Sequence, residues 1–211
     1  ALNERGHRNI VVTDYLAPAK QWQGQVPLST NREEKRRNLE ALKFAAFVEA
    51  DEFRARIARE PQAYGRFSAV FHLGACSSTT ETNVAFLADN NLAYTREMAA
   101  WTLQQGGRFI YASSSSVYGD RPLEGSGFRE DDPTVTPVSL YAATKRSCEL
   151  LSQSYAKLYG FPQSGLRFFT VYGPWGRPDM MMWIFTRAMF AGEPIPVFNA
   201  GPMERDFTFI A

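Results

Sequence analysis

A tyrosine and a lysine four residues apart form the pair in this chain best suited to chemistry. Tyr141 and Lys145, in the run Tyr-Ala-Ala-Thr-Lys, share one face if the segment is helical, so the ammonium can favour ionisation of the phenol. A phenol of ordinary pKa about 10 would then serve as a general base near neutral pH. The spacing alone is a weak signal, because an exposed helical pair of these types also arises by chance.

Four consecutive serines strengthen the signal. The run Ser113–Ser116 follows Arg108–Ala112, a short apolar segment typical of a buried parallel strand. Ligands of open α/β sheets bind at the carboxyl ends of the strands, which is where these serines would lie. Without a tyrosine nearby, such a run would be interpreted as a strand end whose small residues satisfy their own backbone.

The elements that must position these residues alternate between strands and helices. Short apolar runs predict strands at Asn9–Asp14, Phe67–Leu73, Arg108–Ala112 and Gly165–Val171, with a further short strand at Leu42–Phe44. Amphipathic stretches predict helices over Asp51–Glu60, Asn83–Gln105, Leu140–Tyr159 and Met180–Ala191. The polar segment Ala17–Lys35, with two prolines, is expected to be a surface excursion. This alternation predicts an α/β fold with a doubly wound parallel sheet.

Composition limits the function classes. With 211 residues, 45% of them hydrophobic, the chain can bury the core of one domain, or of one domain and part of another. A net charge of +1 gives no reason to expect nucleic acid or an anionic membrane as partner. Cys76 and Cys148 are far apart, which favours free thiols in a reducing compartment, and His7 and His72 do not suggest a metal site. No run reaches transmembrane length, and no signal peptide is expected.

Longer motifs support a resemblance. The second half contains Tyr111–Gly119, Pro137–Lys145, Gly165–Met180 and Arg205–Thr208, and the first half contains His72–Glu81 and Asp89–Asn91. Through these motifs the chain resembles the extended short-chain dehydrogenases/reductases that act on nucleotide sugars. Its second half is similar to the UDP-glucuronate 4-epimerases, whereas its first half is similar to the ADP-glyceromanno-heptose 6-epimerases.

The resemblance implies a Rossmann-like fold and a particular place for this chain within it. Such enzymes open with a strand and a turn of the type Gly-x-x-Gly-x-x-Gly, which is not found here. We therefore expect a fragment that lacks the first strand and the glycine-rich loop. Residues 1–171 would form an NAD(P)-binding domain, and residues 172–211 would begin a substrate-binding region.

The resemblance also implies catalytic roles for three residues. Tyr141 would remove a proton from a sugar hydroxyl, and Lys145 would bind the nicotinamide ribose and lower the tyrosine pKa. Ser114 would hydrogen-bond the reacting hydroxyl. Related dehydratases carry Asp-Glu where this chain has Ser115 and Ser116, so the resemblance favours epimerisation over elimination. Both serines are weaker candidates for contact with the sugar, Ser116 being the better placed.

Further residues are implied to hold the cofactor. Asp14, at a predicted strand end, matches the acid that binds the adenosine ribose, which favours NAD. NADP is the alternative, with Lys20 as the cation for its extra phosphate. The segment Leu73, Gly74 and Ala75 matches the adenosine-side loop, and Asn91 matches the cofactor-side asparagine.

Three residues are implied to hold the nucleotide sugar. Arg205 matches the arginine that pairs with the diphosphate, a task suited to a guanidinium fork. Thr170 and Arg177 match the pair that meets a substrate carboxylate. An isolated arginine in such a loop would be interpreted as a solvated surface residue.

The sequence thus predicts a cytoplasmic, NAD-dependent nucleotide-sugar epimerase that interconverts UDP-glucuronate and UDP-galacturonate through a 4-keto intermediate. An ADP-glyceromanno-heptose 6-epimerase is the alternative within this class. A non-catalytic dinucleotide-fold sensor or scaffold is the alternative from another class. Members of the resembled family commonly pair through two helices, which implies a homodimer with the Tyr141 helix at its interface.

Overall fold

Parallel strands and helices alternate along the chain. The computed structural model describes residues 1–16, 32–120, 127–195, 197 and 206–210. The strands are β1 (Val11–Asp14), β2 (Ala46–Glu49), β3 (Ala69–His72), β4 (Arg108–Ser114), β5 (Gln163–Phe168), β6 (Thr170–Tyr172) and β7 (Phe207–Phe209). The helices are α1 (Arg32–Glu40), α2 (Ala50–Arg59), α3 (Val84–Leu87), α4 (Tyr94–Gln105), α5 (Leu140–Tyr159) and α6 (Met181–Ala191). None of the described helices is long and apolar enough to cross a membrane.

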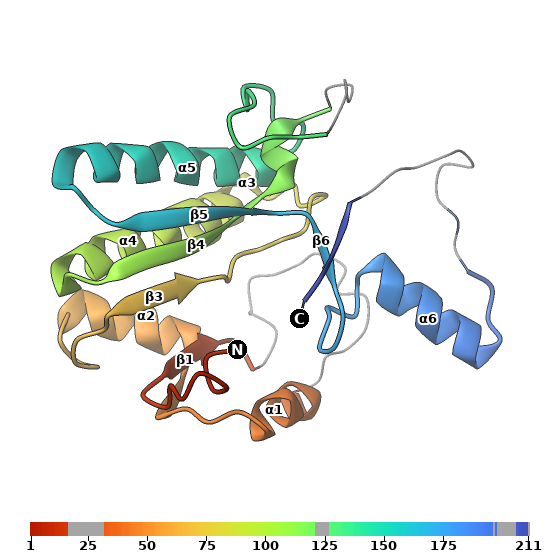
Figure 1. The fold of residues 1–211 in the computed structure, drawn as a ribbon, viewed down its shortest axis with the longest axis horizontal. Helices are drawn as coiled ribbons and strands as arrows, with labels where there is room; N and C mark the ends of the chain where they lie inside the picture. The colour runs from red at the N-terminus through yellow and green to blue at the C-terminus, as the bar shows by residue number, and fades with distance from the viewer. Residues whose placement is uncertain (17–31, 121–126, 196, 198–205, 211) are drawn as a thin grey trace.

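All strand pairs in the described structure are parallel. β3, β4 and β5 form one sheet in that order, β1 pairs with β2, and β6 pairs with β7. Parallel strands joined by crossover helices confirm the predicted Rossmann-like α/β class (Figure 1). Among the described residues, no strand hydrogen-bonds β1 to β3, so the pairing is interrupted at that point.

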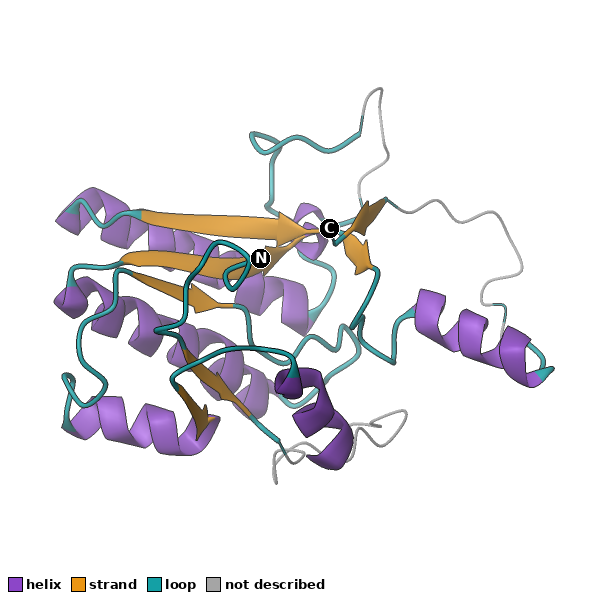
Figure 2. Ribbon diagram, turned by 60° about the horizontal axis from the view of Figure 1, so that its bottom comes forward, coloured by secondary structure: helices purple, strands orange, loops and turns teal. Residues whose placement is uncertain are grey.

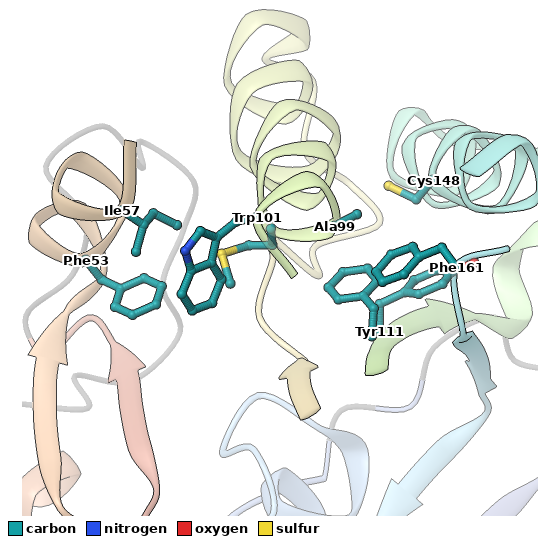
Figure 3. Close-up of a cluster of buried hydrophobic side chains, with 9 residues drawn as sticks. Phe53, Ile57, Ala99, Trp101, Tyr111, Cys148 and Phe161 are labelled. Atoms are coloured by element: carbon teal, nitrogen blue, oxygen red, sulfur yellow. The ribbon is translucent and has the colours of Figure 1, made fainter. Parts of the chain in front are cut away.

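The core lies between the sheet and helices α2, α4 and α5, which run side by side along the strands (Figures 1 and 2). Figure 3 shows Phe53 from α2 and Trp101 from α4 packed together, and Tyr111 and Phe161 beside α5. Side chains alternate across a strand, so β4 turns Phe109, Tyr111 and Ser113 toward these helices. The next residue, Ser114, ends the strand.

Helix α5 has a clear signal at each end. The Ser139 hydroxyl accepts a hydrogen bond from the Ala142 N–H at 3.0 Å, which satisfies one free donor of the first turn. Gly160 ends the helix at φ 60°, a left-handed conformation that glycine adopts without strain. The observed helix has the predicted bounds, and Tyr141 stands in its first turn.

Two strand predictions were wrong in detail. Leu42–Phe44 is not a strand, because Lys43 hydrogen-bonds the side chain of Asn3 through both its N–H and its carbonyl, at 2.8 and 2.7 Å. The strand β2 begins at Ala46 instead. The apolar run Gly165–Val171 forms two strands in different sheets, since an apolar pattern does not reveal hydrogen-bond partners.

The helix predictions were closer to the structure. The stretch Asn83–Gln105 is helical, but its middle part, Ala88–Ala93, is a π-helix, a local widening often found at functional sites. Helix α1 was not predicted, and its first residues, Arg32–Lys35, belong to the segment Ala17–Lys35 that was expected to be an irregular surface excursion. The rest of that segment, residues 17–31, lies outside the described residues. Helix α6 extends away from the sheet in both ribbon views (Figures 1 and 2).

Candidate active site

A large cavity opens at the carboxyl ends of β3, β4 and β5. Its volume is about 1140 Å³, and it lies where open α/β sheets bind ligands. Its walls come from the loop after β3, the end of β4, the first turn of α5 and the stretch from β6 to α6. Of the predicted site residues, the lining includes Leu73, Ala75, Ser114, Ser115, Ser116, Tyr141, Lys145, Thr170 and Arg177.

Ser114, Tyr141 and Lys145 are all buried and all line this cavity. The Lys145 ammonium donates a hydrogen bond to the Ala112 carbonyl at 2.8 Å and lies 5.9 Å from the centre of the Tyr141 ring. The Ser114 and Ser116 hydroxyls are 2.8 Å apart. The structure therefore brings the three predicted catalytic residues together.

Several groups act on the ionisation of Tyr141. Burial raises the pKa of the phenol, while the Ser114 hydroxyl and the Arg177 guanidinium oppose this rise. Arg177 is therefore a second cation, besides Lys145, that can favour the phenolate. The Lys145 ammonium donates to the Ala112 carbonyl, and burial lowers its own pKa. The lowering of the tyrosine pKa by Lys145 stays a prediction.

Asn91 connects three segments that surround the site. Its side chain is fully buried and accepts a hydrogen bond from the Cys76 N–H at 2.9 Å. The amide group donates to the Cys76 carbonyl at 3.0 Å and to the Thr144 hydroxyl at 3.2 Å. These bonds tie the π-helical segment to the loop after β3 and to α5. Asn91 is not among the residues that line the cavity, so its role in the described structure is to position these segments, and its contact with the cofactor stays a prediction.

His72, the last residue of β3, is another buried polar group beside the site. Its Nε2 lies 3.0 Å from the Thr95 hydroxyl, and that hydroxyl donates to the Asn91 carbonyl at 2.6 Å. The imidazole must therefore donate from Nε2. Burial, with a smaller effect of Lys145, lowers the pKa of His72 to about 4, so the ring is neutral and structural at pH 7.

The predicted cofactor residues are distributed unevenly. Asp14 ends β1 as predicted, and its carboxylate accepts a hydrogen bond from the Tyr15 N–H at 2.7 Å, but it does not line the cavity. Leu73 and Ala75 line the cavity, whereas Gly74 between them does not. Lys20 lies outside the described residues.

In the stretch from β6 to α6, Arg177 connects two loops far apart in the sequence. Its Nε and Nη2 donate to the two carboxylate oxygens of Asp179 at 2.9 and 2.6 Å, and its Nη1 donates to the Ser77 hydroxyl. Thr170, at the start of β6, lines the same cavity. Arg205 lies outside the described residues. Sequence reasoning missed Ser77 and Asp179, although the two-residue spacing of Arg177 and Asp179 was a signal for an ion pair.

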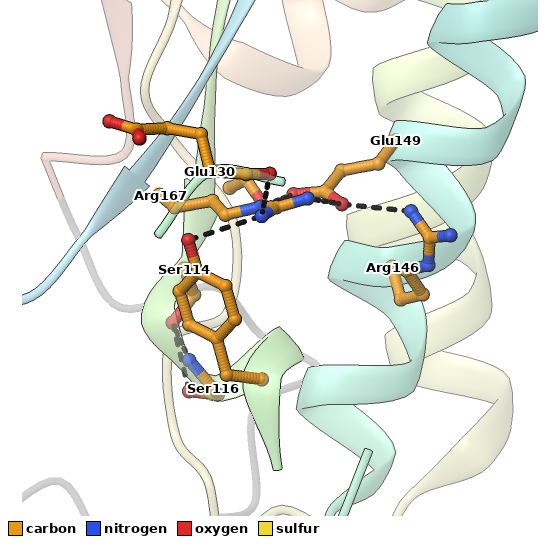
Figure 4. Close-up of polar contacts among 8 residues, drawn as sticks. Ser114, Ser116, Glu130, Arg146, Glu149 and Arg167 are labelled. Carbon is orange, nitrogen blue, oxygen red and sulfur yellow. Dashed lines mark hydrogen bonds and ion pairs between the residues drawn. The ribbon is translucent and has the colours of Figure 1, made fainter. Parts of the chain in front are cut away.

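A buried ion-pair network, also missed, supports the serine run from the side of α5. Glu149 accepts hydrogen bonds from Ser113 at 2.7 Å and from Arg167 at 2.8 and 3.1 Å, and it pairs with Arg146 at 3.1 Å (Figure 4). Arg167 also donates to the Tyr118 hydroxyl at 3.1 Å. Burial opposes ionisation of Glu149, but the bonds from Arg167, Ser113 and Arg146 outweigh it and lower the carboxyl pKa.

Ser114, Tyr141 and Lys145 thus meet at the carboxyl ends of the parallel strands of a Rossmann-like α/β fold, which is where such folds bind ligands. The family model described as the NAD dependent epimerase/dehydratase family matches residues 1–211, so the chain belongs to this family.

Relatives and solved structures agree with this assignment. A probable UDP-glucuronate 4-epimerase of Rhizobium meliloti is 41% identical over 149 residues, covering 67% of this chain and 42% of that protein. UDP-glucuronate 4-epimerase 1 of Arabidopsis thaliana is 51% identical over 104 residues, covering 48% of this chain and 24% of that protein. The crystal structure of UDP-glucuronic acid 4-epimerase from Bacillus cereus, in complex with UDP-glucuronic acid and NAD, matches with a TM-score of 0.78 and 27% identity. That match covers 99% of this chain and 63% of the other, so the chain spans less than two thirds of each of these proteins.

Proposed function

We propose that the protein is an NAD-dependent epimerase that interconverts UDP-glucuronate and UDP-galacturonate at carbon 4. The observation that carries this proposal is the position of Arg177. Its guanidinium lines the same cavity as Ser114 and Tyr141, where it can meet a carboxylate on the sugar whose hydroxyl reacts. The named UDP-glucuronate 4-epimerases among the relatives and the solved structures support this assignment.

The cavity suits a dinucleotide together with a nucleotide sugar. Its volume of about 1140 Å³ exceeds that of most sites for a single small ligand, which extend to roughly 1,000 Å³. Lys145 has three N–H donors and uses one on the Ala112 carbonyl, which leaves donors for ribose hydroxyls. Leu73 and Ala75 would line the adenosine side, with Asp14 at the end of β1. When bound, NAD supplies the acceptor and donor of the hydride at carbon 4.

The proton steps fall to two residues of this chain. The Ser114 hydroxyl would hydrogen-bond the reacting hydroxyl and orient its proton toward Tyr141. Tyr141 would take this proton as carbon 4 becomes a carbonyl and return it when the hydroxyl forms again with inverted configuration. Neither Ser115 nor Ser116 can act as a general acid, and epimerisation requires none at these positions.

Recognition of the sugar would use the wall formed by the stretch from β6 to α6. Arg177, with Thr170 nearby on β6, would bind the carboxylate at carbon 6, while Ser116 would contact a ring hydroxyl. Arg205 would pair with the diphosphate. The proposed protein has an NAD(P)-binding domain in residues 1–171 and the beginning of a substrate-binding region in residues 172–211. It is proposed to be a homodimer located in the cytoplasm.

The test uses the whole gene product, incubated with NAD and UDP-glucuronate and followed by NMR for UDP-galacturonate. Arg177→Ala should abolish saturable binding of UDP-glucuronate. Arg129→Ala is the matched control, because Arg129 also pairs with an aspartate two residues later but does not line the cavity. No product from folded, NAD-loaded protein would refute the proposal and favour an ADP-heptose substrate. Equal binding by the two arginine variants would refute the role of Arg177.

A further inference from the structure

Asp179 occupies the side of Arg177 that is best suited to a carboxylate. The two carboxylate oxygens of Asp179 accept from Nε and Nη2, which is the two-pronged geometry of a strong arginine–carboxylate pair. Both side chains line the cavity. Arg177 therefore already holds an anion in the place where the proposed function requires it to meet the anion of a substrate.

The remaining donors of Arg177 still leave room for a ligand. A guanidinium has five N–H groups, of which Asp179 accepts two and Ser77 accepts one. One N–H remains on Nη1 and one on Nη2. These two groups are left to donate to a substrate carboxylate while Asp179 keeps Nε and one N–H of Nη2.

The charge balance of this wall depends on Asp179. The described acids that line the cavity are Glu81 and Asp179. Glu81 accepts hydrogen bonds from the N–H groups of Thr82 and Asn83 at 2.9 and 2.8 Å, so its carboxylate stabilises the loop in which it lies. Of these two acids, Asp179 is the one that pairs with Arg177, so a ligand that reaches Arg177 meets an ion pair with no net charge.

We infer that Asp179 is a specificity-determining residue, an internal counter-ion that limits the preference of the site for an anionic sugar over a neutral one. This inference rests on the proposed function. With Asp179 present, the Asp179–Arg177 pair can bind a hydroxymethyl group as well as a carboxylate, since it offers both an acceptor and donors. Without the negative charge of Asp179, Arg177 would attract the carboxylate more strongly and gain nothing toward the neutral sugar.

The test compares two ligands that differ at carbon 6 alone. Dissociation constants of UDP-glucuronate and UDP-glucose are measured by calorimetry on the NAD-loaded whole gene product and on Asp179→Asn. The variant keeps the size of the side chain and one acceptor but removes its charge. The ratio of the two affinities should shift toward UDP-glucuronate by about tenfold, and more at low salt. Asp131→Asn is the matched control, because Asp131 pairs with Arg129 at the same spacing outside the cavity.

A second variant tests whether loss of any hydrogen-bond partner of Arg177 changes the affinity ratio. Ser77→Ala removes a neutral partner of Arg177, so it should leave the affinity ratio unchanged. A ratio that is unchanged or falls in Asp179→Asn, while Arg177→Ala loses UDP-glucuronate binding, overturns the inference and leaves the proposed function intact. The fall would mean that Asp179 merely positions Arg177. Unchanged UDP-glucuronate binding in Arg177→Ala overturns both.

Discussion

The two walls of the cavity are built in different ways. On one wall, Ser114, Tyr141 and Lys145 are at most 8% exposed and stand on a central strand and a long capped helix. On the other wall, the Arg177 side chain is 48% exposed and lies in a loop between β6 and α6. The reacting groups are thus fixed by the core, whereas the group proposed to select the sugar is held by a few polar contacts.

The two walls should therefore respond differently to substitution. A substitution on the first wall changes a reacting group, so turnover should suffer, and stability should suffer as well where a buried charged partner is left unpaired. A substitution on the second wall changes partly solvated contacts, so specificity can vary while the fold persists. The variants described next test this contrast between the two walls.

The largest effect is expected for Tyr141→Phe. Removal of the phenol hydroxyl leaves no group to accept the substrate proton, and turnover should fall by about 10³-fold or more. The ring remains, so binding of NAD and the free energy of unfolding should change little. Turnover is followed by NMR, and cofactor binding is followed by calorimetry. Tyr159→Phe, on an exposed residue of the same helix, is the control and should retain full activity. Retained turnover in Tyr141→Phe would exclude Tyr141 as the base.

The next effect concerns stability. Glu149→Gln leaves Arg167 and Arg146 without their anion in a mostly buried setting, so the free energy of unfolding should fall by about 3 kcal/mol. Urea unfolding of the whole gene product measures this change. Glu97→Gln breaks a similar but more exposed bidentate pair with Arg54 and should cost less than about 1 kcal/mol. Equal costs at the two sites would contradict the proposed contrast between buried and exposed pairs.

The same carboxyl makes the stability depend on pH. Because its pKa is lower in the folded protein, the contribution of Glu149 is present above the ordinary carboxyl pKa of about 4.3. This contribution is lost as the pH falls through the lower, folded-state pKa. Glu149→Gln should therefore reduce the difference in stability between pH 6 and pH 3 relative to the native protein.

The fold and the reacting residues could be predicted because local signals determine them. The apolar runs around Ala69–His72 and Arg108–Ala112 are too short for typical helices, which favours strands, and the four-residue spacing of Tyr141 and Lys145 puts both on one face of a helix. The amphipathic pattern predicted the bounds of α5, and the structure has a capping serine and a terminating glycine at those bounds, Ser139 and Gly160. These features depend on residues that are neighbours in the chain.

The features that could not be predicted depend on residues that meet only in the folded chain. The contact of Arg177 with Ser77 joins positions 100 residues apart. Asn91 was identified as a site residue, but no pattern shows that its amide would bond Cys76 and Thr144 and be buried. The direction of the Lys145 ammonium depends on the Ala112 carbonyl at the end of another element.

The smallest effect is expected at Trp175, which lies in the same loop as Arg177. Its backbone has φ 64°, a left-handed conformation that costs an ordinary residue roughly 1–2 kcal/mol, and its side chain is 72% exposed. Asparagine tolerates this conformation better, so Trp175→Asn should raise the free energy of unfolding by up to about 1 kcal/mol. Trp183→Asn, the same replacement within helix α6, should lower it instead, because that position is helical and less exposed. Urea unfolding of both variants measures these changes. A loss of stability in Trp175→Asn would mean that packing of the indole stabilises this loop. The contrast between the two walls would then be weaker than their exposure suggests.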